Sequence, residues 1–260
     1  MSAAITELVR YRDLLLLWTL REVRVRYQQS VLGAAWAVLQ PLTMMLVFTI
    51  VFSRLIRVDT DGIPYPIFVY SALVPWTYFT TAIAQGIPSL VNNMNLVTKI
   101  YFPREILPFA SVGASMLDYL IAFSIFLGMM VFYSVPVRPM MLLVIPLLLL
   151  QILLMLGVTL IGGAVIVFFR DMRFVVPLMT QVWMYATPII YPVSLVPEWF
   201  RPYYYLNPMA GIIDGYRRVL LLGELPDAQG VAISAVVSLL LLVSGYLLFK
   251  RLEPLFADLI

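Results

Sequence analysis

The chain has 260 residues, of which 62% are hydrophobic and 12% charged; its mean hydropathy is +0.96 and its formal net charge is +3. Soluble domains carry about 25% charged residues, so this composition excludes a water-soluble globular protein and a disordered one. Cysteine and histidine are absent, which excludes disulfides, Cys/His zinc sites, haem ligation by histidine, Cys–His pairs and Ser–His–Asp triads. We therefore expect a membrane protein without catalytic residues or a metal site.

Long charge-free runs predict where the chain crosses the membrane. A helix needs about 20 apolar residues to cross a hydrocarbon core of roughly 30 Å. Six spans fit, and we expect them near residues 33–54, 67–91, 106–134, 140–168, 174–192 and 229–249. None of the runs alternates like a barrel strand, so the predicted fold class is an all-α integral membrane protein with six transmembrane helices.

The placement of the charges predicts the orientation. Six spans put both termini on one side, where eleven of the 17 basic residues are expected, against six on the other side. Basic loops stay inside, so we expect both termini in the cytoplasm. Asp118 is the one charge expected at membrane depth. A hydrogen bond between helices is favoured over a proton relay, because most coupled carriers have several intramembrane ionisable groups.

Residues 1–30 predict an amphipathic helix at the cytoplasmic face, ahead of a membrane domain over 31–253. An apolar run from Leu14 to Leu20 is followed by Arg21, Arg24 and Arg26, without a small-residue cleavage site. We expect the basic face of this helix to point outward. The alternative is a soluble tail, which the leucines disfavour.

Two other segments are too polar or too short to span. Residues 92–103 predict a short amphipathic helix on the cytoplasmic face, and Pro103 can open the next span. The outer segment 193–228 contains PYYYLNPMAGII, from Pro202 to Ile213. Its 12 residues and two prolines favour a re-entrant hairpin over an external loop.

The sequence excludes nucleotide hydrolysis by this chain. Its two lysines, Lys99 and Lys250, lack the glycines of a Walker A motif, so ATP-driven work must come from a partner. A membrane-embedded lipid enzyme is also disfavoured. Such enzymes use intramembrane His, Cys or acidic clusters, and here only Asp118 qualifies.

Aromatic residues gather on the second and fifth expected spans and in the outer segment. One interpretation is the aromatic belt at the membrane interfaces; the other is a pore lining, because aromatic rings suit the apolar faces of sugars. The candidate channel-lining residues are Trp36, Trp76, Tyr78, Phe79, Trp183 and Tyr185.

Five motifs follow one another at matching topological positions: REVRVRYQQSVLGAAWAVLQPL (21–42), LVTKIYFPREILP (96–108), FFRDMRF (168–174), TPIIYPVSLVP (187–197) and YLNPMAGIIDGYR (205–217). Together they resemble the permease subunit of type-2 ABC transporters that export polysaccharides such as O-antigen, capsule or teichoic acid. The resemblance covers the whole chain, and none of the motifs is decisive alone. A type-2 permease for a smaller amphiphile, such as a drug or lipo-oligosaccharide, is the alternative.

The resemblance implies a homodimer in the cytoplasmic (inner) membrane of a bacterium. Two copies of a separate ABC ATPase subunit would bind ATP and Mg²⁺, and a lipid-linked glycan would be the substrate. Membrane lipids are further partners, whereas nucleic acid and a cofactor in this chain are not expected. The residues expected to dock the ATPase are Arg21, Arg24, Arg26, Asn95, Lys99, Tyr101, Arg104, Glu105, Arg170 and Asp171. Those expected in an outer gate are Tyr205, Asn207, Pro208 and Arg217.

Overall fold

A computed structural model describes residues 10–28, 33–60, 62–99 and 102–259, and these residues form helices and loops without a strand. The α-helices are α2 (Arg12–Tyr27), α3 (Trp36–Phe48), α4 (Tyr65–Gly86), α5 (Ser89–Asn92), α6 (Met94–Lys99), α7 (Ile106–Phe132), α8 (Val144–Phe168), α9 (Met172–Tyr185), α10 (Arg201–Tyr204), α11 (Pro208–Arg217) and α12 (Ala228–Leu259). Shorter 3₁₀ or π-helical turns are η1 (Gly33–Ala35), η2 (Thr49–Leu55), η3 (Pro139–Leu143), η4 (Val193–Leu195), η5 (Glu198–Phe200) and η6 (Arg218–Leu222). The all-α prediction is confirmed for this part of the chain.

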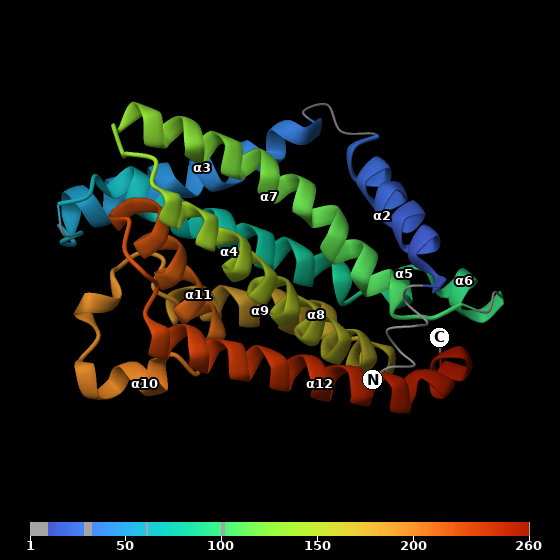
Figure 1. Cartoon of the computed structure of the whole chain (residues 1–260). Helices are drawn as coiled ribbons and strands as arrows, with labels where there is room; N and C mark the ends of the chain where they lie inside the picture. The colour runs from blue at the N-terminus through green and yellow to red at the C-terminus, as the bar shows by residue number, and fades with distance from the viewer. Residues whose placement is uncertain (1–9, 29–32, 61, 100–101, 260) are drawn as a thin grey trace.

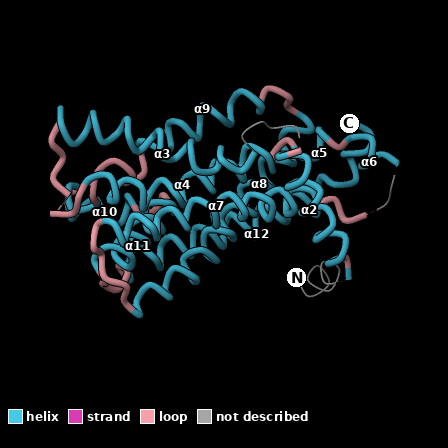
Figure 2. Tube along the Cα trace, turned by 90° about the horizontal axis from the view of Figure 1, so that it is seen from above, coloured by secondary structure: helices cyan, strands magenta, loops and turns pink. Residues whose placement is uncertain are grey.

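The long helices form an elongated bundle (Figure 1). One end carries α5, α6, the start of α2 and the end of α12, and we term it the α6 end. The opposite end, termed the α11 end, carries α10 and α11, and the view from above shows the same separation (Figure 2). The described parts nearest the two termini therefore lie at the same end of the bundle.

Five helical segments are long and apolar enough to cross a membrane: residues 36–55, 65–86, 106–132, 139–168 and 228–256. They match five of the six expected spans to within a few residues at most boundaries. The central one is α4, which is 78% buried over its most apolar window, against 17% for the spans of α3 and α12. The helices at the edge of the bundle therefore keep wide apolar faces for lipid or for another protein.

The span expected over 174–192 is not confirmed as a membrane-crossing helix. The helix in this region, α9, has 14 residues and is therefore about 21 Å long, shorter than the roughly 30 Å hydrocarbon core. It ends at Tyr185, and residues 186–192 form turns and irregular structure. Pro188 explains the end, since it lacks a backbone N–H and disfavours helical geometry at Thr187.

Glycines allow α8 and α12 to pack closely. A Cβ atom on Gly157 would lie 2.7 Å from the backbone of Leu241 and Leu242, and one on Gly245 would lie 2.7 Å from the Gly157 carbonyl oxygen. Small residues let the backbones of membrane helices come into close contact. In lipid the hydrophobic effect does not drive helices together, so van der Waals packing stabilises such contacts. The contact fixes α12 along α8.

The segment expected to form one helix over 92–103 is divided. The helix α5 ends at Asn92, and α6 occupies only Met94–Lys99. At the break, the Asn93 side chain donates to the Ser89 carbonyl, and the Asn93 carbonyl accepts from the backbone N–H groups of Leu96 and Val97. A short helix is thus present, but it begins two residues later than expected.

The outer segment folds into the bundle. Every residue of α11 is buried, and the helix packs against α12, α4 and α8. Because α11 is buried along its whole length, this part of the segment is not an external loop. Met209, Ile212, Ile213 and Tyr216 of α11 instead join the main core of the bundle.

Candidate functional site

Two adjoining cavities flank the central helix α4. The smaller, of about 160 Å³, lies among α2, α3, α4 and α7, and the larger, of about 430 Å³, lies among α3, α4 and α9. Gln40 and Thr81 line both. We term the two together the α4 groove.

The walls of the α4 groove combine apolar side chains with polar ones that are largely uncharged. Its hydroxyl- and amide-bearing residues, aromatic ones apart, are Gln40, Thr77, Thr80, Thr81, Gln85, Thr180 and Gln181. The charged lining residues are Arg26 and Asp118, which form an ion pair. Sequence reasoning missed these uncharged residues. The signal was available, because Thr77, Thr81 and Gln85 recur every four residues and so share one face of α4.

Four of the six candidate channel residues line the α4 groove. Trp36 and Tyr78 line the smaller cavity, and Trp76 and Tyr185 line the larger one. Trp36 and Tyr185 are both more than half exposed, whereas Tyr78 and Trp76 are nearly buried.

The other two candidates, Phe79 and Trp183, line neither cavity of the groove. Phe79 is fully buried and packs edge-on against Trp183, with ring centroids 4.9 Å apart. This pair joins α4 to α9, so its position is behind the groove wall.

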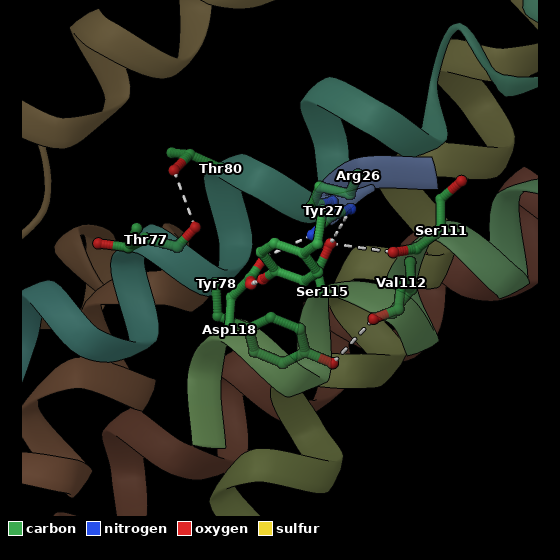
Figure 3. A network of polar contacts seen from close by, with 9 residues as sticks. All are labelled: Arg26, Tyr27, Thr77, Tyr78, Thr80, Ser111, Val112, Ser115 and Asp118. Carbon is green, nitrogen blue, oxygen red and sulfur yellow. Dashed lines mark hydrogen bonds and ion pairs between the residues drawn. The ribbon is translucent and has the colours of Figure 1, made fainter. Parts of the chain in front are cut away.

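Asp118 holds α2 against the middle of α7 (Figure 3). Its carboxylate forms an ion pair with Arg26 and accepts a hydrogen bond from the Tyr27 hydroxyl. Arg26 also donates to the Ser115 hydroxyl at 3.3 Å. The expected hydrogen bond between helices is therefore present.

The same contacts correct two expectations about the N-terminal helix. Arg21 and Arg24 lie on the exposed face of α2, but Arg26 turns inward, so the basic residues do not form one outward face. Arg26 thus lies against Asp118, the one charge expected at membrane depth, and not apart from it with the other basic residues. The guanidinium and the carboxylate neutralise each other, which lowers the cost of placing either charge there.

Several residues expected to dock an ATPase are exposed at the α6 end. Asn95 and Lys99 are exposed on α6, and Arg170 and Asp171 are exposed in the turn between α8 and α9. Arg21 donates to the Asn93 side chain at 3.4 Å, which brings α2 next to α5. Tyr101 lies outside the described residues.

Two other expected docking residues instead tie α7 to α12. Glu105 is fully buried, and its carboxylate lies 2.8 Å from the Lys250 ammonium. Lys250 also pairs with Glu253 at 3.0 Å, and the Arg104 guanidinium donates to the Glu253 carbonyl. The buried Glu105 side chain therefore cannot lie on a docking surface, because it is the internal partner of Lys250.

At the α11 end, Asn207 links α9 to α11. As the N-cap of α11, its side-chain oxygen accepts from the Met209 backbone N–H at 3.1 Å, and it also accepts from the Trp183 indole at 2.7 Å. Its amide donates to the Ala186 carbonyl and the Thr187 hydroxyl. Pro208 follows at the first helical position, where its missing N–H is harmless.

Arg217 supports the irregular segment after α9 from inside the protein. Its guanidinium donates to the carbonyls of Ile189, at 3.0 Å, and Tyr191, at 3.4 Å, and lies 3.7 Å from the centre of the Phe68 ring. Burial lowers the pKa of Arg217 to about 10, so the side chain keeps its charge at neutral pH. Of the expected gate residues, Tyr205 packs in a small cluster with Val193 and Ala210, and it lines the same cavity as Arg217.

A helical bundle with several candidate membrane spans is typical of transmembrane transport proteins when a groove beside its central helix carries neutral polar and aromatic residues, here together with one ion pair. Comparison with known families identifies the particular one. Residues 13–221 match the family described as ABC-2 type transporter, and the chain belongs to this family. The family resemblance seen in the sequence motifs is thereby confirmed.

Named relatives cover nearly the whole chain. The O-antigen export system permease protein RfbA of Myxococcus xanthus is 30% identical, with 99% of each chain aligned. A protein of the same name from Klebsiella pneumoniae is 28% identical over 95% of each chain. The polysialic acid transport protein KpsM of Escherichia coli is 23% identical over 90% of this chain and 91% of its own.

Proposed function

We propose that the chain is the permease subunit of an ATP-driven exporter that moves a lipid-linked polysaccharide across the cytoplasmic membrane of a bacterium. The lining of the α4 groove carries this proposal, because it combines uncharged amides and hydroxyls with aromatic rings. Polysaccharides offer hydroxyl groups and apolar C–H faces that match such a surface. The names of the relatives, which refer to O-antigen export and polysialic acid transport, support the same substrate class.

We further propose that two copies of the chain enclose the substrate path. Within one copy, the larger cavity of the groove lies between α3, α4 and α9, and its lining residue Tyr185 is 55% exposed. The span of α3 is also only 17% buried. A second copy facing this side would cover the groove, and two-fold dimers are the commonest soluble oligomers.

Energy would come from two ATPase subunits, which would bind ATP and Mg²⁺. The docking surface proposed for them is the α6 end, where Arg21, Lys99, Arg170 and Asp171 are exposed. The excess of basic residues expected on that side supports its placement in the cytoplasm. The contacts of Glu105 and Lys250 would then transmit motion from the docking region to α12.

The test uses the permease and its ATPase reconstituted in vesicles with a lipid-linked glycan. Thr81→Phe should lower ATP-dependent glycan transport about tenfold, because the added ring occupies the point that both cavities share. Ser124→Phe is the matched control, since Ser124 is exposed on α7 and lines neither cavity. Equal transport by the two variants would contradict a substrate path through the α4 groove. ATP hydrolysis by the purified chain alone would contradict the proposal that a separate subunit hydrolyses ATP.

A further inference from the structure

A third cavity, at the α11 end, is separate from the α4 groove and shares no lining residue with it. We term it the outer cavity. Its volume is about 380 Å³, which falls within the range of roughly 300–1,000 Å³ typical of small-molecule sites. It is lined by parts of α4, α11 and η6 together with the loops around η4 and η5 and the segment leading into α12.

Arg217 gives this cavity a buried donor without a partner. The side chain lines the cavity and the residue is 4% exposed, and two of its nitrogens donate to the carbonyls of Ile189 and Tyr191. The third nitrogen, Nε, is buried and has no hydrogen-bond partner among the described residues. Nearly all buried polar groups in proteins are paired, so the guanidinium beside the cavity keeps one unused donor, which is closed to solvent in this structure.

The charges around the outer cavity nearly balance, with one carboxylate in excess. Its walls carry three guanidinium groups and four carboxylates, from Arg201, Arg217, Arg218, Glu198, Asp214, Glu224 and Asp227. Arg218 pairs with Asp214 at 2.9 Å and with Glu224 at 3.7 Å, and Arg201 lies 3.9 Å from Glu198.

This balance selects the kind of ligand. A strongly anionic ligand would meet the four carboxylates, and a cationic one would meet the three guanidinium groups. A neutral ligand with many hydroxyls can accept from the guanidinium groups and donate to the carboxylates at the same time. Thr60, Ser194 and Gln229 add neutral donors and acceptors to the walls.

We propose that the outer cavity is a carbohydrate-binding site that holds a short stretch of an uncharged glycan at the α11 end. The inference deepens the proposed function and rests on it, because the exported glycan is the source of the sugar. Arg217 connects the site to the segment after α9, since the same side chain lines the cavity and binds the Ile189 and Tyr191 carbonyls. A bound sugar therefore contacts the residue that holds this segment in place.

Binding is measured on the assembled transporter in lipid nanodiscs by saturation-transfer NMR. The probes are neutral hexasaccharides of glucose, mannose and N-acetylglucosamine, and an oligogalacturonide of the same length serves as the acidic probe. At least one neutral probe should receive saturation, and it should do so more strongly than the acidic probe. Absence of transfer to all three neutral probes, or a stronger signal from the acidic one, would overturn the proposal.

Two neighbouring substitutions assign the signal to the cavity. Ser194 is exposed and lines the cavity, so Ser194→Trp should occupy part of it and lower the transfer about tenfold. Leu195 is exposed and does not line it, so Leu195→Trp should leave the transfer unchanged. Gln229→Ala, at another exposed wall position, should weaken the transfer without filling the space. Equal signals from Ser194→Trp and Leu195→Trp would refute the site.

Glycan transport by the same preparations separates this inference from the proposed function. Transport without cavity-dependent binding would refute the outer site and leave the exporter intact. Binding that Ser194→Trp abolishes, in a transporter that moves no glycan, would refute the exporter and leave a carbohydrate site.

Discussion

The pair of Arg26 and Asp118 shows how one charge is stabilised inside a helical bundle. The two side chains are 20% and 16% exposed, and Tyr27 and Ser115 supply further hydrogen bonds. Burying two paired charges costs little free energy, whereas removal of one partner leaves the other charge desolvated and unpaired. The pair therefore constrains the position of α2 against α7 more than it adds stability.

The pair is expected to make a single substitution more destabilising than the double substitution. Asp118→Leu should lower the free energy of unfolding by about 3 kcal/mol, because Arg26 then lacks its partner. The double variant Arg26→Met, Asp118→Leu should recover most of that loss. Unfolding in a denaturing detergent, followed by tryptophan fluorescence, measures both. Additive losses in the double variant would show that the two residues do not act as a pair.

The sequence could predict only half of this contact. Asp118 stands alone in an apolar run, and an isolated intramembrane carboxylate calls for a partner. The partner lies 92 positions earlier, in a segment with three basic residues close together. Nothing in the spacing of Arg21, Arg24 and Arg26 shows which of them turns inward, because that depends on how α2 packs on α7.

At the scale of elements, length and hydropathy predict the spans that are regular helices. They fail for the run that contains Pro188, where α9 ends at Tyr185, although Pro75 is tolerated within α4. The burial of α11 was also beyond prediction. The position of α11 depends on contacts with three long helices and on the bonds of Asn207, which lie far apart in the sequence.

The close packing of α8 and α12 predicts that two glycines respond oppositely to alanine. Gly157→Ala should lower the free energy of unfolding by about 2 kcal/mol, because the new methyl group meets the α12 backbone and the helices must separate. In Gly128→Ala on α7, the new methyl group has no neighbouring atom within 4 Å. This variant should raise the free energy of unfolding by about 0.5 kcal/mol, because alanine has a higher helix propensity than glycine. The same detergent titration measures both, and a Gly157→Ala variant as stable as the native chain would contradict this packing.

At the scale of the whole molecule, burial is uneven. The central helix α4 has protein on nearly all sides, whereas the spans of α3 and α12 are each only 17% buried. Only the α3 edge adjoins the α4 groove. Lipid suffices to cover the apolar face of α12, but hydrocarbon against the amides and hydroxyls of the groove would leave polar groups without partners. The proposed second copy therefore belongs on the α3 side.

Cross-linking tests this placement without background, because the native chain has no cysteine. Gln181 is exposed on α9 and lines the groove, so in membranes Gln181→Cys should join two copies through a flexible bismaleimide. Leu240→Cys, on the exposed face of α12, should remain monomeric under the same treatment. The reverse pattern would place the second copy on α12. In that case the groove would have to be closed by lipid or by a different subunit, and the polar lining would no longer support a path formed between two copies.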